Sequence, residues 1–483
     1  MYSFETNINR VRKRGKLSHH TARKVMTVLY FLATLLALCV VCGILLALPV
    51  SQREHVSALN IIFTAVSTVT LTGIVTVNTA TSWTPAGLTI LMIITQLAAM
   101  TYIILAAAVA LEMGIRLKHN IPKSEQNKNN KQKKVLHGDF LYFAKFVIIF
   151  IFLIEIAGAV LFFLYYCTVS TKTISGNIFA AVFNAVSGFC NGGLILYNDG
   201  VINIFGLHLP PITHNIPQML IFAVLALIGG LGFVVLYELI FLRTHKQLSL
   251  HTKLVLSTTA IFLVICTAVF YIYELSPINT KTYLFADTNK LNAFVTSIFM
   301  PISARGLGIA SVDLTMLSAP TYFFLSLLMF IGGAPGGMSS GIKITTVAII
   351  VISIWTQLRR KQDIEIFKRR ISNETVRFAL TIVTASFLFI ILCVWIVGIT
   401  EANNAHSSFG FASYAYIISL VISAFSNIGF DPNIAGNLTP VTKSIIIVIM
   451  LVGRVSSVLF FYVFASPAVK QLRRYPIEPI LEG

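Results

Sequence analysis

Eight long apolar runs constrain the fold of this 483-residue chain more than any other feature of its sequence. An α-helix needs ~20 predominantly apolar residues to cross a bilayer core of ~30 Å, and each run reaches that length. The runs are Val25–Val50, Ala86–Leu111, Phe140–Tyr166, Ile216–Phe241, Lys253–Tyr273, Tyr322–Trp355, Val376–Ile399 and Val441–Phe464. The sequence therefore predicts an all-α integral membrane protein with eight transmembrane helices.

Composition excludes several other classes of protein. Hydrophobic residues make up 56% of the chain and charged residues 11%, against about 25% charged residues in ordinary soluble domains. The six cysteines lie mostly inside apolar runs, which argues against a disulfide framework. The histidines show no metal-ligand spacing, and no cluster of intramembrane acids or histidines suits catalysis. We therefore predict that the protein is not an enzyme and has no covalent cofactor.

The basic residues predict an orientation in the membrane. The formal net charge is +18, and the positive side chains cluster in the N-terminal tail and in every second connection. The clusters in the connections and at the C-terminus are Lys118–Lys134, Arg243–Lys253, Arg359–Arg370 and Lys470–Arg474. Because cytoplasmic connections are enriched in Lys and Arg, we expect a multi-pass protein of the cytoplasmic membrane, surrounded by lipid, with both termini in the cytoplasm. This explains the charge better than a nucleic-acid partner does.

The connections on the opposite side of the membrane resemble one another. Each has an apolar stretch of about three turns, a Ser or Thr, a short run and then a glycine. The segments are Ser67–Val77, Asn184–Leu194, Phe299–Ile309 and Val421–Asp431, with matching glycines Gly73, Gly193, Gly308 and Gly429. The intervals between these glycines are 120, 115 and 121 residues. This regularity predicts four parallel span–pore-loop–span repeats around a central pore, with four re-entrant half-helices.

The repeats and basic clusters together predict the domain organisation. The expected units are a cytoplasmic tail (1–24), repeat 1 (25–117), a cytoplasmic linker (118–139), repeat 2 (140–245), repeat 3 with a broken second helix (246–358), a second linker (359–375), repeat 4 (376–473) and a C-terminal tail (474–483). Each repeat crosses the membrane an even number of times, so all four have the same orientation.

The glycine-bearing loops have a composition that suits a monovalent cation. Backbone carbonyls can replace the water shell of such an ion, and glycine tolerates the backbone conformations that this requires. No Asp or Glu lies in the glycine-bearing core of any loop, which argues against a ring of carboxylates for divalent ions. Polar residues follow each core, at Asn78, Asp199, Asp313 and Asp431. They could form an outer mouth that concentrates cations, or they could simply cap and solvate the loops.

The sixth apolar run is too long for a simple span and is interrupted between Gly332 and Gly341. Small residues and Pro335 break a helix there. Unwound backbone at membrane depth is tolerated only where it lines a cavity or is buried in protein. We interpret this break as a gate beneath the pore loops. The alternative is a glycine kink that allows tight helix packing.

Cationic side chains near the pore add to this interpretation. Arg454 lies inside the last apolar run, where an arginine at the helix centre costs about 2.5–3.5 kcal/mol and should therefore face the protein interior or water. We interpret it as a positive constriction that faces the break; the alternative is an ion pair with a carboxylate elsewhere. Lys343 could point into the same cavity, whereas Arg305 is expected to brace the third loop. The thiol of Cys190 is expected to be accessible to small cationic reagents from outside.

Four motifs carry a resemblance to a known family. They are S-T-V-T-L-T-G-I-V-T-V in the first loop, S-A-R-G-L-G-I-A-S-V-D in the third, S-A-F-S-N-I-G-F in the fourth, and G-G-A-P-G-G-M-S-S-G-I-K-I-T-T over Gly332–Thr346. They resemble motifs of the Trk/Ktr/HKT superfamily of potassium transporters, and the resemblance covers almost the whole chain. Eight spans without an additional leading pair look most like the Ktr-type membrane subunit.

The resemblance implies potassium uptake through a selectivity filter, gated by the intramembrane loop. The implied filter residues, with K+ bound only there, are Thr70, Leu71, Thr72, Gly73, Cys190, Asn191, Gly192, Gly193, Gly306, Leu307, Gly308, Ser426, Asn427, Ile428 and Gly429. The implied gate residues are Gly332, Gly333, Gly336, Gly337, Ser339, Ser340, Gly341, Lys343 and Arg454. A homodimer and a cytosolic nucleotide-binding regulatory ring are implied as well. Sodium stays open as a coupling ion.

Two departures from the family pattern leave an alternative function open. The third loop has Gly306-Leu307 where the resemblance leads us to expect Thr-Ala. The second loop has Cys190 and Gly192 where Asn and Ala are commoner. Selectivity could therefore be looser, and a sodium-permeable or weakly selective cation transporter of the same fold is the alternative.

Overall fold

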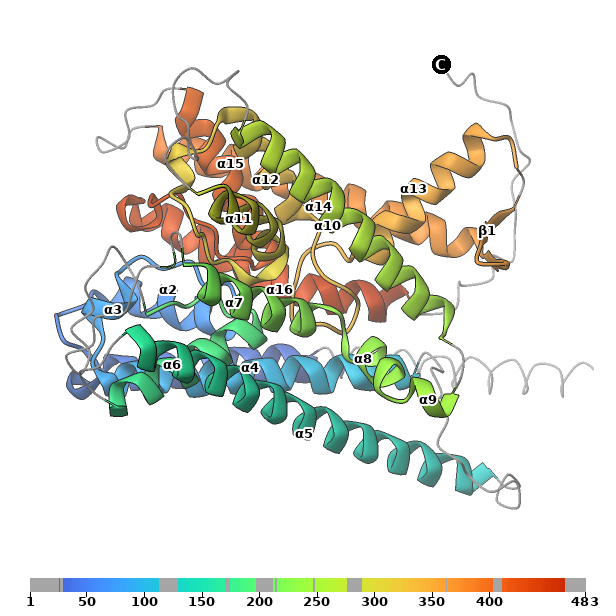
Figure 1. Cartoon of the computed structure of the whole chain (residues 1–483), viewed down its shortest axis with the longest axis horizontal. Coiled ribbons are helices and arrows are strands. Elements are labelled where there is room, and N and C mark those ends of the chain that lie inside the picture. The colour runs from blue at the N-terminus through green and yellow to red at the C-terminus, as the bar shows by residue number, and fades with distance from the viewer. Residues whose placement is uncertain are drawn as a thin grey trace, which may run out of the picture.

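The structure is a computed structural model, and it describes residues 26, 29–112, 129–169, 174–196, 212, 215–245, 248–275, 289–361, 363–402 and 411–464. The predicted N-terminal and C-terminal tails, the first half of the first cytoplasmic linker and Asp199 lie outside the described residues. Long helices run along the molecule, and a small hairpin projects at one end of it (Figure 1).

The described chain is mostly helical. After a helix over Leu29–Ala47, its first half contains η1 (Pro49–Ser51), α2 (Ala58–Val69), α3 (Thr79–Ser82), α4 (Pro85–Glu112), α5 (Asn129–Val169), α6 (Ile174–Cys190), α7 (Ile216–Gly230), α8 (Phe233–Ile240) and α9 (Leu242–His245). The second half contains α10 (Leu250–Leu275), α11 (Lys290–Ile302), η3 (Ser303–Leu307), η4 (Leu314–Met316), α12 (Ala319–Phe330), α13 (Ile344–Leu358), β1 (Ile364–Ile366), β2 (Arg369–Ile371), α14 (Asn373–Glu401), α15 (Phe411–Ser426), η5 (Ala435–Asn437) and α16 (Pro440–Phe464). The strands β1 and β2 pair in an antiparallel hairpin.

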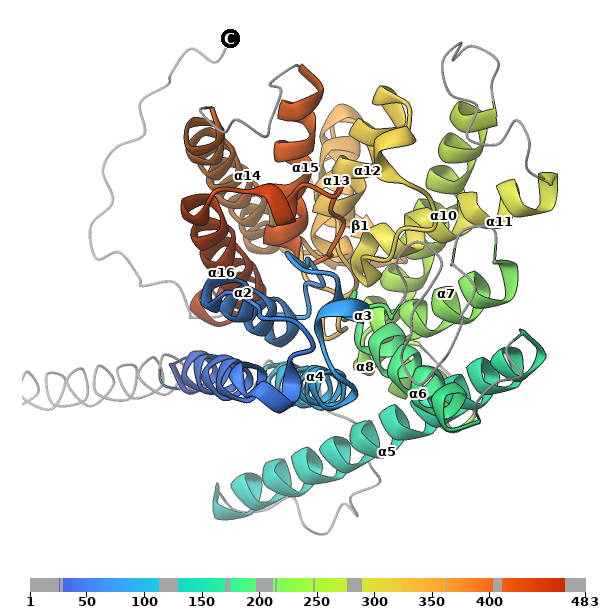
Figure 2. The same ribbon diagram turned by 90° about the vertical axis from the view of Figure 1, so that its left-hand side faces the viewer.

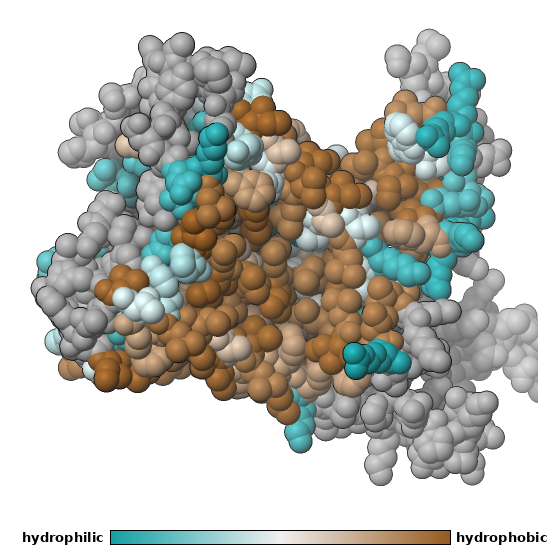
Figure 3. Space-filling view, in the orientation of Figure 1, coloured by the Kyte–Doolittle hydropathy of each residue, from teal (hydrophilic) through white to brown (hydrophobic). Residues whose placement is uncertain are grey.

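The surface of this helical body is apolar. Within the described residues, five helices are long and apolar enough to cross a membrane, or six if the bent pair α7 and α8 is one span. Brown, hydrophobic residues cover the middle of the face in Figure 3, with hydrophilic residues gathered toward its ends. Large apolar side chains such as Val264, Leu388 and Trp395 are more than 60% exposed. The predicted class, an all-α membrane protein, is confirmed.

Four short helices differ from the long ones. The helices α2, α6, α11 and α15 have 12, 17, 13 and 16 residues, fewer than the ~20 needed to cross a bilayer. Figure 2, in which α4, α14 and α16 are seen nearly end-on, shows these four arranged about a common centre. Contacts of α2 with α16, of α6 with α5, of α11 with α10 and of α15 with α16 place each against a long helix of the surrounding shell. Each of them ends within one of the four segments in which the sequence predicts a half-helix followed by a pore loop.

One apolar run departs from the prediction. The run Ile216–Phe241 was expected to form a single span, but α7 and α8 are bent by 98° at a break of a few residues. The break follows from the sequence Gly229-Gly230-Leu231-Gly232, in which Gly232 has a positive φ of 86°. The prediction of one unbroken helix over the fourth apolar run is therefore wrong.

The two broken helices satisfy each other's backbone groups. The predicted break in the sixth run is the loop of residues 331–343 between α12 and α13, hereafter the α12–α13 loop. Its Ala334 N–H donates to the carbonyl oxygen of Gly230 at 2.9 Å, and its Met338 N–H donates to that of Gly229 at 3.0 Å. In return, the N–H of Phe233 donates to a carbonyl of the loop at 3.3 Å. Because unpaired backbone groups are costly in a membrane interior, each break stabilises the other.

Replacing Gly232 with alanine tests this junction. An alanine at position 232 would have to adopt the positive φ of Gly232, which L-residues rarely do. Its Cβ would also lie 2.6 Å from the carbonyl oxygen of Pro335. We expect Gly232→Ala to lower the free energy of unfolding by at least about 1–2 kcal/mol, measured by unfolding of the purified protein in detergent. Gly43→Ala is the matched control, because a Cβ there meets only Ala65 at 4.0 Å. Equal stability of the two variants would contradict the mutual support of the breaks.

Candidate functional site

The four short helices end in loops that are fastened in the same way. A serine near the end of each helix reaches across its loop, and these serines are Ser67, Ser187, Ser303 and Ser423. In the first three loops the hydroxyl donates to the carbonyl oxygen of the residue after the glycine, at 2.6–2.7 Å. In the fourth, the hydroxyl accepts a hydrogen bond from the N–H of the glycine itself, at 3.1 Å. We call these loops the glycine loops: Thr70–Gly73, Cys190–Gly193, Gly306–Gly308 and Ser426–Gly429.

The third glycine loop is one residue shorter than the others. The serine and the glycine are five residues apart there and six apart elsewhere. In the other three loops, the residue two before the glycine is left-handed, with φ of 54° at Leu71, 52° at Asn191 and 49° at Asn427. The third loop instead continues as the π-helical turn η3. The missing residue accounts for one residue in each of the glycine intervals of 115 and 121, because the serines are separated by 120, 116 and 120 residues.

The four glycines meet inside the helical shell. A Cβ added to Gly73 would lie 2.5 Å from the Cα of Gly193, and one added to Gly193 would lie 3.3 Å from the carbonyl oxygen of Leu307. A Cβ on Gly308 would lie 3.0 Å from the Cα of Gly429, and one on Gly429 would lie 3.3 Å from the carbonyl carbon of Gly73. Each loop therefore contacts the next in a closed ring, too tightly for side chains at these positions.

Carbonyl oxygens gather at these contacts. The oxygen of Gly192 lies 2.8 Å from the Cβ position of Gly73, and the oxygen of Thr72 lies 3.0 Å from that of Gly193. The four oxygens that approach neighbouring glycines belong to the residues just before each glycine, Thr72, Gly192, Leu307 and Ile428. Chemically, this is a cluster of neutral oxygen ligands with no carboxylate among them, the kind of group that suits a monovalent cation.

The first and fourth glycine loops are joined by side chains. The amide Nδ2 of Asn427 donates to the hydroxyl of Thr72 at 2.8 Å and to the carbonyl oxygen of Met450 on α16 at 2.9 Å. The hydroxyls of Thr70 and Thr72 lie 2.7 Å apart. All of these side chains are buried. The hydroxyl of Thr72 therefore links two loops that are 355 residues apart in the sequence.

The second glycine loop rests on a buried carboxyl group. The Cys190 thiol donates to Glu155 on α5 at 3.5 Å and to the side-chain oxygen of Gln96 on α4 at 3.3 Å. Gln96 in turn donates to Glu155 at 3.0 Å. Cys190 is 0% exposed, so the structure does not support the expected access of thiol reagents from outside. The sequence reasoning missed Gln96, although a lone amide in an apolar run is the signal that could have found it.

Two cationic side chains hold the α12–α13 loop. Arg454 donates to the carbonyl oxygen of Met338 at 3.0 Å and to the hydroxyl of Ser340 at 2.7 Å. Lys343 donates to the carbonyl oxygen of Ser339 at 2.7 Å and to the hydroxyl of Tyr102 at 3.2 Å. The Arg454 guanidinium also stacks 4.1 Å from the centre of the Tyr102 ring. Tyr102, on α4, was not singled out from the sequence.

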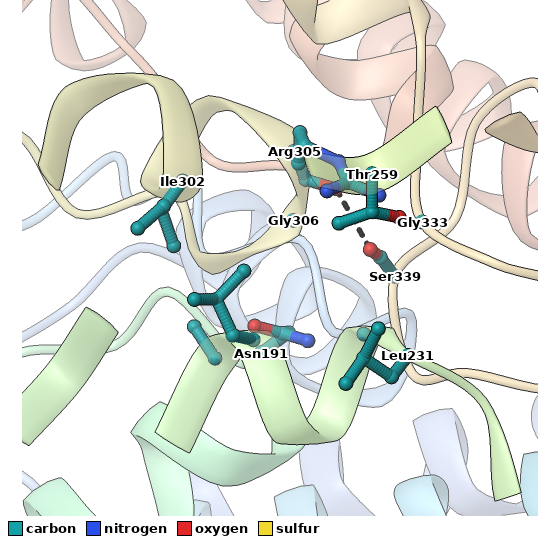
Figure 4. Close-up of a pocket in the computed structure, with 11 residues that line it drawn as sticks. Asn191, Leu231, Thr259, Ile302, Arg305, Gly306, Gly333 and Ser339 are labelled. Atoms are coloured by element: carbon teal, nitrogen blue, oxygen red, sulfur yellow. Dashed lines mark hydrogen bonds between the residues drawn. The ribbon is translucent and has the colours of Figure 1, made fainter. Parts of the chain in front are cut away.

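The α12–α13 loop touches the third glycine loop directly. The hydroxyl of Ser339 donates to the carbonyl oxygen of Arg305 at 2.7 Å. A Cβ on Gly306 would lie 2.6 Å from the Cβ of Ser339, so the absence of a side chain at Gly306 makes room for this contact. Most of the predicted gate glycines serve close approach as well: a Cβ on Gly337 would lie 2.7 Å from the oxygen of Gly230. Gly336 differs, because a Cβ there would meet no atom within 4 Å, and its glycine instead suits a positive φ of 78°. Figure 4 shows Ser339 bonded to Arg305 beside Gly306.

The polar residues predicted at the outer mouth act locally as caps. Asn78 accepts a hydrogen bond from the N–H of Ala80 at the start of α3. Asp313 accepts one from the N–H of Thr315 in η4, at 2.9 Å. Asp431 accepts one from the N–H of Ile434, at 3.0 Å. The capping alternative therefore has structural support at these three positions. Attraction of cations by them stays a prediction.

Fold and site together define a polytopic helical membrane protein in which the four glycine loops, with their uncharged carbonyl oxygens, meet inside the helical shell. The sequence matches the TrkH profile, described as cation transport protein, over residues 32–471, and the chain belongs to this family. The family comprises cation transporters, which confirms the prediction that the protein is not an enzyme.

Individual relatives extend over nearly the whole chain. It is 30% identical to Ktr system potassium uptake protein B of Bacillus subtilis, over 96% of this chain and 97% of that protein. It is 28% identical to potassium/sodium uptake protein NtpJ of Enterococcus hirae, over 91% of this chain and 94% of that protein. The fold matches the crystal structure of the potassium transporter TrkH from Vibrio parahaemolyticus with a TM-score of 0.60 and 18% identity, covering 83% of this chain and 77% of that one.

The junction of the first and fourth glycine loops can be tested with Thr72→Val. Valine has nearly the shape of threonine but removes the hydroxyl that accepts from Asn427, leaving a buried donor with one partner fewer. We expect the free energy of unfolding in detergent to fall by about 1–3 kcal/mol. Thr101→Val is the control, because its hydroxyl bonds only to the carbonyl of Leu97 in its own helix and is exposed. If both variants were equally stable, the hydroxyl would not join the loops.

Proposed function

We propose that the protein carries potassium ions into the cell across the cytoplasmic membrane, through the ring formed by the four glycine loops. The observation that carries this proposal is the convergence of the carbonyl oxygens of Thr72, Gly192, Leu307 and Ile428. Relatives that match nearly the whole chain are named potassium uptake proteins, which supports potassium as the cargo.

Neutral oxygens are suited to this task because they replace the water shell of a monovalent ion without binding it too tightly to leave. A ring of carboxylates would hold a divalent ion instead. The tight packing of glycine against glycine keeps the four carbonyls in place without side chains between them. The serine hydroxyls behind the loops hold the backbone in this shape.

The α12–α13 loop is the proposed gate, together with Arg454 and Lys343. The loop is buried, and its backbone oxygens at Met338 and Ser339 are occupied by these two cationic side chains. Positive charge beside the path of a cation raises the electrostatic barrier to passage, so the arrangement opposes conduction both sterically and electrostatically. Movement of the loop would remove both obstacles.

Regulation and assembly complete the proposal. We propose a homodimer whose gate is controlled by a cytosolic nucleotide-binding subunit docked on the cytoplasmic side. The connection between α13 and α14 supports such docking, because it projects from the helical body as the β1–β2 hairpin and carries the exposed side chains of Arg359, Arg360 and Arg369. We also propose that the N- and C-termini lie in the cytoplasm.

Reversal potentials test the function and its alternative. Purified protein in proteoliposomes is placed between opposed potassium and sodium gradients, and the voltage of zero current is measured. We expect it to follow the potassium gradient. A reversal potential that follows sodium as well would favour the sodium-permeable alternative, and no cation current with the regulatory subunit present would contradict the function.

Arg454→Gln tests the gate. The substitution removes charge-assisted hydrogen bonds worth about 1.5–3 kcal/mol from the closed loop. If these bonds hold the loop closed, the balance between closed and open states shifts by about tenfold or more. Potassium flux into proteoliposomes without the regulatory subunit is therefore expected to rise. Arg359→Gln is the control, since Arg359 is exposed and stacks on Trp355 at the helix end. Flux that is unchanged or lower in a well-folded Arg454→Gln protein would exclude the gating role.

A further inference from the structure

A small cavity lies behind the second and third glycine loops, against the α12–α13 loop. It offers about 10 Å³, which is roughly what a single water molecule requires. Its walls include Asn191 from the second loop, Gly306 from the third loop with Arg305 just before it, Thr259 from α10, and Ser339. Figure 4 shows the amide of Asn191 on one wall and the side chains of Arg305 and Thr259 on the opposite wall.

Three polar atoms on these walls lack hydrogen-bond partners. They are Nε of Arg305, Oγ1 of Thr259 and Oδ1 of Asn191. The three residues are only 6%, 6% and 2% exposed, so bulk water does not satisfy them. Leaving a buried donor or acceptor unpaired costs about 1–3 kcal/mol. Because all three residues line the same cavity, one molecule bound there could serve as their shared partner.

The Thr259 hydroxyl is available because it does not bond to its own helix. Threonine and serine side chains inside helices commonly donate to the carbonyl four residues earlier. The neighbouring Ser257 and Thr258 do so, at 2.8 Å and 2.6 Å. Thr259 makes no such bond and lines the cavity instead.

Arg305 carries a charge into the same place. Its guanidinium lies 5.5 Å from the centre of the Phe262 ring, one turn along α10 from Thr259. Among the residues that the structure describes, no carboxylate forms an ion pair with it. This guanidinium excludes a cation from the cavity.

The opposite junction of the ring shows what is missing here. In the fourth loop, Asn427 donates to the hydroxyl of Thr72 in the neighbouring loop. Asn191 holds the same position in the second loop, but the neighbouring third loop offers Gly306 and Leu307, which have no hydroxyl. The junction of the second and third loops therefore has a cavity, whereas the junction of the fourth and first loops has a side-chain hydroxyl that joins them.

We propose that this cavity binds one ordered water molecule that joins the second and third glycine loops from behind. The water accepts from Arg305 Nε, donates to Asn191 Oδ1, and shares a hydrogen bond with the hydroxyl of Thr259. Both the small volume and the acceptor oxygen of Asn191 favour water over an anion such as chloride. Resting on the proposed function, this water positions the carbonyls of Gly192 and Leu307 and so supports the preference for potassium.

The water is tested by high-resolution cryo-electron microscopy of the full chain, with and without chloride in the buffer. We expect density in the cavity of the unsubstituted protein under both conditions, and its loss in Thr259→Val. An empty cavity in the unsubstituted protein would overturn the proposal. Density that depends on chloride would overturn it too, by making this an anion site. This result does not depend on which ion the protein transports.

The consequence for selectivity is measured on the same variants in proteoliposomes. Thr259→Val is expected to lower the potassium-to-sodium permeability ratio by about three- to tenfold, the equivalent of one lost hydrogen bond. Thr259→Ser, which keeps the hydroxyl, and Thr258→Val, whose hydroxyl serves its own helix, are expected to keep the ratio of the unsubstituted protein. A ratio in Thr259→Val equal to that of Thr258→Val would overturn the positioning role of the water. Absence of any potassium preference in the unsubstituted protein, with the water present, would instead refute the proposed function.

Discussion

The need to pair every backbone polar group at membrane depth governs this structure. Four short helices stop inside the helical shell, and two long ones break there, which leaves many N–H and C=O groups without helical partners. The structure pairs the groups of one break with those of the other, at Ala334 to Gly230 and Met338 to Gly229. In the glycine loops, serine hydroxyls satisfy the backbone from behind. The oxygens of Thr72, Gly192, Leu307 and Ile428 each approach the glycine of a neighbouring loop, and in the proposed function a potassium ion pairs with them.

The same constraint connects the proposed filter to the proposed gate. The α12–α13 loop does not simply lie beneath the ring. Ser339 is bonded to the backbone of Arg305 in the space left by Gly306. The third glycine loop is one residue short and lacks the left-handed residue of the others, so its shape depends on what packs behind it. Movement of the proposed gate would therefore change the conformation of the third glycine loop first. The residues of this loop also depart most from the family pattern.

Much of the fold could be predicted because it follows from local composition. The apolar runs predicted a helical membrane protein, and the glycine spacing predicted four loops that the structure brings together at Gly73, Gly193, Gly308 and Gly429. The break between Gly332 and Gly341 also follows from its small residues and proline. The bend at Gly232 was missed because an apolar run with glycines resembles an ordinary span until its partner is known. Contacts such as Gln96 with Glu155, or Tyr102 with Arg454, join residues that are far apart in the sequence. No local pattern of residues indicates which of them meet in the folded chain.

In the proposed function, a potassium ion binds where the four glycine loops meet. The most direct test is an experimental structure in rubidium or thallium, which substitute for potassium and are located by their anomalous scattering. We expect a dominant peak between the carbonyl oxygens of Thr72, Gly192, Leu307 and Ile428, and we expect excess potassium to displace it. A dominant peak elsewhere, for example beside Glu155, with none in the ring, would contradict it.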